Sequence, residues 1–199
     1  MFRTKEALIP YLLWAAVVAA GLLWHESQML PGLGRTVITG RMAVGGPYAL
    51  TDQNGHLRSS ADFAGHYQLI YFGYTFCPDV CPTTLALMAA ALDKMGADKN
   101  RIVPIFITVD PDRDKPSVMK KYLAAFGPRF VGLTGTRSEI AKVEREYHVF
   151  AQRQPLASGN YAMSHSSVIY LLGPDGRLVS VYDNLASPED LAKALKRQI

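Results

Sequence analysis

Apolar and polar positions divide the chain into three parts. From Leu8 to Trp24 the sequence reads LIPYLLWAAVVAAGLLW, an uncharged run without a polar face. Residues 25–40 (HESQMLPGLGRTVITG) contain glycine and proline and show no sustained period, which is typical of a tether. From residue 41 to residue 199, apolar runs of strand length alternate with helical segments, and this pattern predicts one domain.

The N-terminal run predicts a transmembrane helix over residues 8–24. At about 1.5 Å per residue this helix is roughly 25 Å long, near the lower limit for crossing a bilayer. Arg3 and Lys5 precede it, so the positive-inside rule places residues 1–7 in the cytoplasm and the rest of the chain on the far side. A cleaved signal peptide is the alternative, because small residues stand near the end of the run, although the run continues to Trp24. The domain is exported in either case.

Within the domain, two continuous apolar runs predict central strands that are covered on both faces, Gln68–Phe72 and Ile102–Val109. Turn signals predict two hairpins. The first joins 48–51 to 56–59, and the second joins 167–172 to 178–182. The predicted helices are 82–95, 116–126, 138–148 and a last one that opens after Ser187.

Two helix starts are predicted in more detail. Pro82 is placed at the first helical position, where its missing N–H costs nothing, and Ser138 is placed as an N-cap. The order is hairpin, strand, helix, strand, helix, short strand, helix, hairpin, helix. It predicts an α/β, thioredoxin-like fold, with a central mixed β-sheet flanked by helices and an N-terminal transmembrane helix in front.

Composition narrows the function. The 199 residues are 49% hydrophobic and 19% charged, which suits one domain with a substantial core. The net charge of +4 comes without a basic run or an aromatic-basic stripe, so no nucleic-acid partner is expected. The chain has two cysteines, Cys77 and Cys81, and a disulfide between them would close too small a loop to stabilise the fold. Their role is therefore predicted to be chemical.

The cysteines lie where a central strand passes through a loop into a helix, in YFGYTFCPDVCP (71–82). A thiol at a helix N-terminus is expected to favour the thiolate, which both metal binding and disulfide exchange require. Positions i and i+4 share one helix face, so both sulfurs could converge on one ion or on each other. Two thiolates suit Cu(I), with zinc as the other candidate, although a structural zinc site usually has four protein ligands. The alternative to a functional role is that the two cysteines are inert, buried thiols.

One histidine of five is a candidate third ligand. His165 precedes an apolar run, and in a thioredoxin-like sheet that strand neighbours the cysteine-bearing strand, so the preceding loop faces the cysteine turn. Surface or structural roles are expected for His25, His56 and His66, and His148 is expected to end a helix, where a cation is favoured by the dipole.

Three blocks of sequence resemble the Sco/SenC family of copper chaperones over roughly residues 45–199. They are GYTFCPDVCPTTL (73–85), TVDPDRDKP (108–116) and SHSSVIYLLGPDG (164–176). The resemblance implies a thioredoxin-like domain that binds one copper ion through Cys77, Cys81 and His165. Asp110, which heads the DPDRD block, would orient ligands or partners, although a turn or capping role is as good an interpretation. The family often has Asp before the histidine, whereas Ser164 stands here.

Family membership would imply a chaperone rather than an enzyme. The expected partner is the copper-centre subunit of cytochrome c oxidase, to which the protein would deliver copper or whose cysteines it would reduce. Other copper carriers or thiol reductants are further partners. With the anchor, the expected location is the inner (cytoplasmic) membrane, as a single-pass protein with its domain on the periplasmic side or the equivalent exported face.

Two rival functions share the predicted fold. A thiol-disulfide oxidoreductase of the thioredoxin-like class is the first alternative. Against it stand the C-x-x-x-C spacing and the lack of a proline beside His165, the nearest upstream one being Pro155. A peroxidase of the peroxiredoxin kind is the second, and it is disfavoured because Thr75 stands two residues before Cys77 rather than three.

Overall fold

The computed structural model describes residues 44–157, 159–183 and 186–199. The predicted cytoplasmic segment (1–7), transmembrane helix (8–24) and tether (25–40) lie outside the described residues. Within the three described ranges, no helix has both the length and the apolar character needed to cross a membrane.

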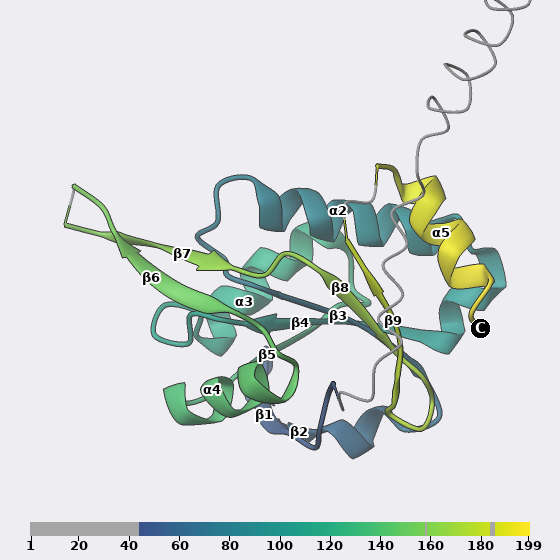
Figure 1. Cartoon of the computed structure of the whole chain (residues 1–199), viewed down its shortest axis with the longest axis horizontal. Coiled ribbons are helices and arrows are strands. Elements are labelled where there is room, and N and C mark those ends of the chain that lie inside the picture. Colours follow the sequence, from purple (N-terminus) through teal and green to yellow (C-terminus); the bar gives the residue numbers. More distant parts are fainter. Residues whose placement is uncertain (1–43, 158, 184–185) are drawn as a thin grey trace, which may run out of the picture. The chain divides into compact units, whose positions relative to one another are not determined.

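A mixed sheet of seven strands forms the centre of the described domain (Figure 1), in the order β2-β1-β5-β4-β3-β8-β9. The three middle strands are parallel to one another: β3 (Tyr67–Gly73), β4 (Ile102–Thr108) and β5 (Val131–Thr134). The outer strands pair antiparallel: β1 (Ala49–Asp52), β2 (Leu57–Ser59), β8 (Ile169–Leu172) and β9 (Leu178–Tyr182).

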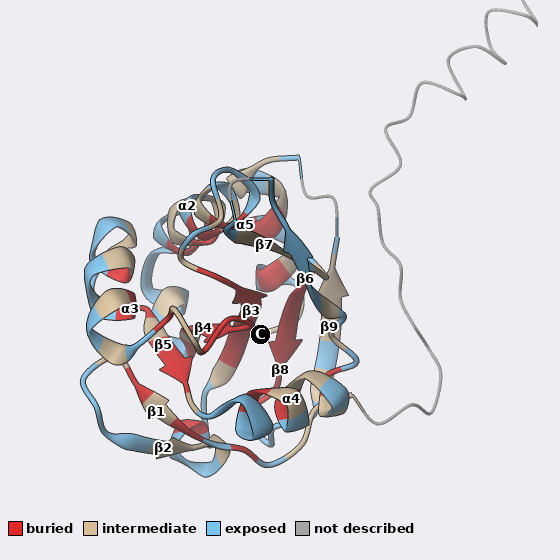
Figure 2. Cartoon of the chain, turned by 90° about the vertical axis from the view of Figure 1, so that its left-hand side faces the viewer, coloured by how far each residue is buried: buried red, intermediate tan, exposed pale blue. Residues whose placement is uncertain are grey.

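Helices cover both faces of this sheet. Figure 2 shows α2 and α5 together on one side and α4 on the other. The α-helices are α2 (Val80–Asp93), α3 (Pro116–Leu123), α4 (Arg137–Glu146) and α5 (Pro188–Lys196), and the short 3-10 helices are η1 (Ser60–Phe63), η2 (Gly96–Arg101) and η3 (Ala124–Phe126). The predicted α/β fold, with a central mixed sheet flanked by helices, is confirmed.

The two apolar runs are the most buried strands, as predicted. Residues 69–72 of β3 and 105–107 of β4 have no exposed surface, because helices pack on both faces of the sheet. β3 and β4 pair in parallel along their whole length, from Tyr67 opposite Ile102 to Gly73 opposite Thr108. The C-terminal end of β3 is therefore fixed on a rigid platform, and the cysteine loop starts there.

Two predicted helix starts are wrong in detail. α2 begins at Val80, so Pro82 is its third residue rather than its first. A proline fits there equally well, because none of the first N–H groups of a helix has an intrahelical partner. α4 begins at Arg137 with Thr136 as its N-cap, and Thr136 and Glu139 form a capping box. Ser138 lies inside the helix.

A hairpin that the sequence did not predict separates α4 from the sheet strand β8. Its strands are β6 (Ala151–Pro155) and β7 (Tyr161–His165), which pair only with each other as a separate two-stranded sheet in the described part of the chain. Figure 1 shows the hairpin reaching out from the body of the domain. His165 is the last residue of β7. His165 therefore precedes the apolar strand, as predicted, but it ends β7 instead of lying in a loop, and the sheet strand begins at Ile169 rather than at residue 167.

Candidate metal centre

The cysteine loop leaves β3 at Gly73, a position that has no room for a side chain. A Cβ there would lie 2.8 Å from the Phe106 ring and 3.0 Å from the Cys81 sulfur. A Cβ contact under 3.0 Å is essentially never seen in proteins, and one of 3.0 Å is unusually tight, so a larger residue would force the ring or the sulfur to move. The glycine thus allows the first turn of α2 to pack its thiol directly against the end of the strand.

The two thiols lie in different surroundings. Cys77 is partly exposed in the loop, whereas Cys81 is completely buried in the first turn of α2, and both are free thiols. The backbone N–H of Cys81 donates to the Cys77 sulfur over 3.4 Å. The Cys77 sulfur therefore sits over the positive end of α2, as expected for a thiol at a helix N-terminus.

Burial opposes the expected thiolate at Cys81. Burial raises the pKa of the Cys81 thiol from its ordinary value of 9.0 to about 12, so this thiol is protonated at neutral pH. Desolvation of the charged sulfur outweighs the helix dipole at this position. The Tyr71 hydroxyl, itself buried, donates to the same sulfur over 3.8 Å.

His165 comes to the thiols from the hairpin. Its Nε2 lies 3.4 Å from the Cys81 sulfur, and its Nδ1 lies 2.9 Å from the Ser166 carbonyl oxygen. A carbonyl only accepts, so Nδ1 carries the proton and Nε2 presents its lone pair to the sulfur. Burial lowers the pKa of the imidazole, which keeps the ring neutral. The rings of Tyr71 and Tyr74 meet it edge to face, at 6.2 and 5.8 Å between centroids.

The structure thus brings together Cys77, Cys81 and His165. The contacts run pairwise, from Cys77 to the amide of Cys81 and from the Cys81 thiol to His165. In the described part of the chain, no group of three or more His, Cys, Asp or Glu side chains is already placed so that it could hold a metal ion. The described histidines other than His165 are exposed: His56, His66 and His148. His25 lies outside the described residues.

Asp110 has no hydrogen bond to either thiol or to the imidazole among the described residues. Its carboxylate is buried, accepts from the Tyr161 hydroxyl over 2.9 Å and pairs with Arg113. It acts on the β4–α3 loop and on the hairpin, one layer behind the candidate ligands.

Asp114 is a second buried carboxylate, which the sequence pattern did not reveal. It accepts from the backbone N–H of Thr75 (3.0 Å), the Thr75 hydroxyl (2.6 Å) and the Thr108 hydroxyl (2.6 Å). These bonds fasten the cysteine loop to the end of β4. Burial nevertheless raises the pKa of this carboxyl. The only sequence signal is its place in the DPDRD block, where no period marks it as buried.

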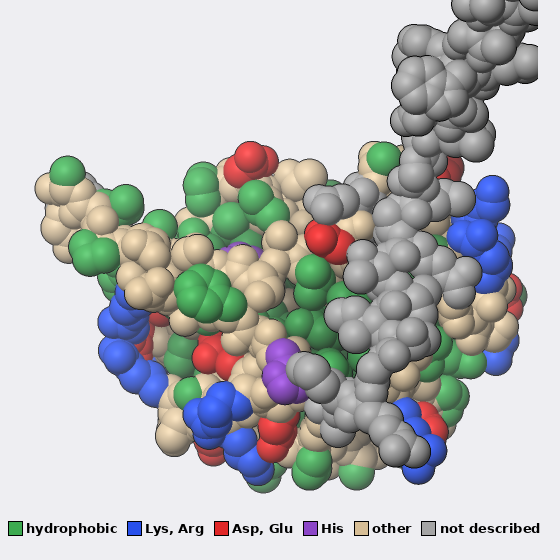
Figure 3. Space-filling view, in the orientation of Figure 1, with side chains coloured by type: hydrophobic (Ala, Val, Ile, Leu, Met, Phe, Trp, Pro, Cys, Tyr) green, Lys and Arg blue, Asp and Glu red, His purple; other side chains and the backbone are tan. Residues whose placement is uncertain are grey.

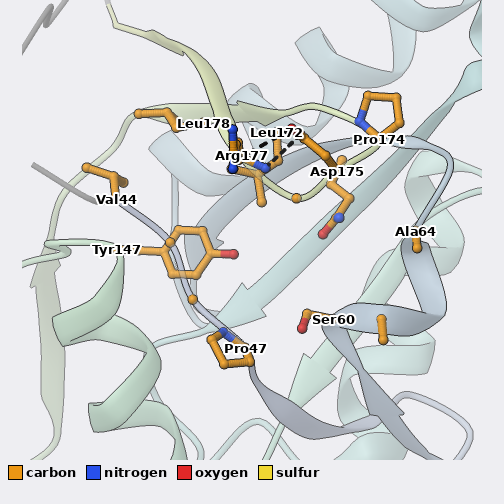
Figure 4. A pocket seen from close by; sticks show the side chains of 15 residues that line it. Val44, Pro47, Ser60, Ala64, Tyr147, Leu172, Pro174, Asp175, Arg177 and Leu178 are labelled. Carbon is orange, nitrogen blue, oxygen red and sulfur yellow. Dashed lines mark hydrogen bonds and ion pairs between the residues drawn. The ribbon is translucent and has the colours of Figure 1, made fainter. Parts of the chain in front are cut away.

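A cavity of about 650 Å³ lies elsewhere in the described part of the chain. Figure 4 shows it between the start of the described chain, η1 and the β8–β9 turn, with Tyr147, Ser60 and Pro174 among its labelled walls. Gln68 at the beginning of β3 also lines it, whereas the thiols follow the end of that strand. The cavity is therefore separate from the thiol site.

Comparison with known proteins gives consistent matches. The family model SCO1/SenC matches residues 37–199. The SCO2-like protein RP587 of Rickettsia prowazekii is 38% identical over 198 residues, which cover 98% of this chain and 97% of the relative. The structure of Bradyrhizobium japonicum ScoI with copper bound has a TM-score of 0.74 and 47% identity, over 79% of this chain and 100% of that one. BsSco, a member of the Sco family of cytochrome c oxidase assembly proteins in which a disulfide switch has been identified, has a TM-score of 0.64 and 27% identity, over 79% and 94%.

Proposed function

The chain belongs to the SCO1/SenC family, and from that premise we propose that Cys77, Cys81 and His165 together bind one copper ion as cargo. The observation that carries the proposal is the 3.4 Å approach of the His165 Nε2 to the Cys81 sulfur, across 84 positions of sequence. Each of the two atoms is a metal-ligating atom, one from the first turn of α2 and the other from the end of β7. Their meeting is best explained by a shared ligand.

The donor set suits copper better than zinc. The two sulfurs are soft ligands that favour Cu(I), imidazole also suits copper, and Cu(I) accepts low coordination numbers. A structural zinc site would need a fourth ligand, and the nearby carboxylates Asp110 and Asp114 are both engaged in other bonds. The residues present therefore fit copper, after small movements that bring the three donors onto one centre.

The surroundings explain how the site would load. Cys77 is the accessible thiol and offers the first contact for an incoming ion. The neutral imidazole has its lone pair ready, so it has no proton to lose. Cys81 must give up its proton, and the energy of metal binding drives that step.

Copper delivery to cytochrome c oxidase, or reduction of cysteines at its copper centre, is the proposed use of this site. Support comes from the copper-bound neighbour ScoI and from BsSco, whose family assembles cytochrome c oxidase. We extend the proposal to the N-terminal run: residues 8–24 anchor the chain in the inner membrane and the domain faces the periplasm or its equivalent. The uncharged run after Arg3 and Lys5 supports this topology.

One observation favours a second candidate, a thiol-disulfide oxidoreductase. Cys77 is partly exposed above a helix N-terminus while Cys81 is buried behind it. An accessible thiol followed by a protected one is the arrangement that thiol-disulfide exchange requires. A bound metal and a disulfide are mutually exclusive states of the same two sulfurs, so both activities could use one site.

Copper titration of matched histidine variants tests the proposal. The reduced chain is titrated with Cu(I) against a competing chelator, as wild type, His165→Ala and His66→Ala. We expect one copper per chain, with a sharp loss of affinity in His165→Ala and no change in His66→Ala, because His66 is exposed and away from the thiols. Unchanged copper retention in His165→Ala, together with strong reduction of insulin disulfides, would instead favour the oxidoreductase.

A further inference from the structure

The β6–β7 hairpin that carries His165 shares no ladder with the main sheet in the described part of the chain. His165 pairs only with Ala151, at the base of the hairpin, and most of β6 is exposed. A two-stranded hairpin is marginally stable by itself in water. Side-chain contacts between the hairpin and the body therefore contribute to the position of the imidazole.

Arg113, in the loop between β4 and α3, supplies such contacts to the start of β7. Its Nη1 donates to the Tyr161 carbonyl oxygen over 2.9 Å and to Asn160 Oδ1 over 3.4 Å. Its Cζ stands 3.8 Å from the centroid of the Tyr161 ring, which places the cation on the ring face. Backbone and side chain of the same hairpin residue are thus held by one guanidinium.

The same guanidinium also faces the cysteine loop. Its Cζ lies 4.8 Å from the centroid of the Phe76 ring and 5.8 Å from that of Tyr74. Phe76 immediately precedes Cys77, and Tyr74 meets the imidazole of His165 edge to face at 5.8 Å. A single planar cation therefore lies between the segment that bears the thiols and the segment that bears the imidazole.

Asp110 fixes this cation in place. Its side chain is 0% exposed, pairs with the Arg113 Nε and accepts from the Tyr161 hydroxyl. The carboxylate thus holds both the guanidinium and the ring on which it stacks. Arg153 of β6 contacts the other part of this cluster, 4.4 Å from the Tyr161 ring, and pairs with Asp112. Figure 3 shows Lys and Arg side chains, with Asp and Glu between them, at the base of the hairpin.

We propose that Arg113 is a positioning residue, which clamps the β6–β7 hairpin to the cysteine loop through Tyr161 and Phe76 and so places His165 over the thiols. This inference rests on the proposed copper site. Arginine is required because its planar guanidinium can stack on an aromatic ring and, at the same time, donate hydrogen bonds within its own plane. Residues behind a metal ligand typically change metal affinity by about 10- to 100-fold when they are replaced.

A double-mutant cycle measures this role. Cu(I) affinity is determined for wild type, Arg113→Met, His165→Ala and the double variant. In the chain that keeps His165, we expect Arg113→Met to weaken Cu(I) binding at least about tenfold. In the His165→Ala background we expect almost no effect, because no imidazole remains to be placed. Equal losses in both backgrounds would overturn the proposal, because Arg113 would then act on the thiols or on the fold.

Amide hydrogen exchange of the metal-free, reduced chain gives a readout that does not need copper. We expect faster exchange in β6 and β7 of Arg113→Met, with β3 and β4 unchanged. Arg137→Met is the matched control, since Arg137 also pairs with Asp112 but is 68% exposed. Unchanged protection of β7 would overturn the clamp. If Arg113→Met does not fold, Arg113→Lys keeps the charge without the fork and must show the same changes, smaller in size.

The two proposals fail in different ways. If His165→Ala binds copper as tightly as wild type, the assignment of His165 as a ligand is wrong, and the exchange experiment still decides whether Arg113 holds the hairpin. If His165→Ala binds copper weakly but the cycle shows no coupling, the copper site stands and the clamp is wrong.

Discussion

Replacing Cys77 by serine leaves Cys81 as the single thiol of the chain, and its reactivity tests the electrostatics of the site. The Cys81 sulfur is fully buried, and burial raises its pKa from 9.0 to about 12. Alkylating reagents attack the thiolate, so the native Cys77→Ser protein should react far more slowly than the same protein unfolded in urea.

The size of the effect follows from that difference of about three pH units. At pH 8 the native protein holds about a thousandfold less Cys81 thiolate than the unfolded chain. A more basic thiolate is a better nucleophile, and with a Brønsted coefficient of about 0.4–0.5 the rate constant of each thiolate is about 16- to 32-fold higher in the native protein. The net slowing is therefore about 30- to 60-fold from ionisation alone. Reagent access to a buried sulfur adds to this slowing, whereas replacing Cys77, whose sulfur also raises the Cys81 pKa, reduces it.

Alkylation is followed by intact mass at pH 8 with excess reagent, on native and urea-unfolded samples of Cys77→Ser. Cys81→Ser is the control, because the remaining Cys77 is partly exposed and should be alkylated readily in the folded state. A native rate for Cys81 within about tenfold of the unfolded rate would refute the reasoning, since burial would then neither protect the sulfur nor disfavour its charge.

Three further predictions concern packing, hydrogen bonding and pH. Gly73→Ala should destabilise the fold by about 1–3 kcal/mol in urea unfolding, because the new Cβ would lie 2.8 Å from the Phe106 ring. Thr75→Val should lower the unfolding free energy by about 1–3 kcal/mol in the same assay, because the buried Asp114 loses a 2.6 Å hydrogen bond. The share of Cys81 in the Cu(I) affinity should rise about tenfold per pH unit between about pH 6 and pH 8, because its raised pKa means that this ligand releases one proton on binding. A chelator competition, corrected for the pH dependence of the chelator, measures this, and a flat profile would contradict it.

The core of the fold was predictable because the apolar pattern of its central strands indicates one environment, burial on both faces. Continuous apolar runs such as 68–72 fit only a strand that is covered on both faces, and the structure buries them completely. The β6–β7 hairpin escaped prediction for the converse reason. β6 is exposed at four of its five positions, so no alternation of apolar and polar residues marks it. The errors at helix starts came from choosing Ser138 when Thr136 and Glu139 already form a capping box.

The candidate site was predictable only as far as chemistry is written in single residues. Thiols and imidazoles are rare enough that Cys77, Cys81 and His165 could be singled out, and the structure places them in pairwise contact, while their role as a ligand set stays a prediction. The protonation of Cys81 was predicted wrongly, because spacing reveals the helix dipole but not the depth of burial. Arg113 and Asp114 could not be found, since their roles depend on contacts between loops that are far apart in sequence.

Because the hairpin is separate from the main sheet, the thiols and the imidazole of the site are held by different parts of the structure. The thiols are tied to the most deeply packed strand, so any change that loosens them also weakens the protein as a whole. The imidazole arrives on a projecting arm whose sequence carries little of the core. Substitutions of exposed hairpin residues can therefore change how strongly the third ligand binds, while the thermal stability of the domain stays the same.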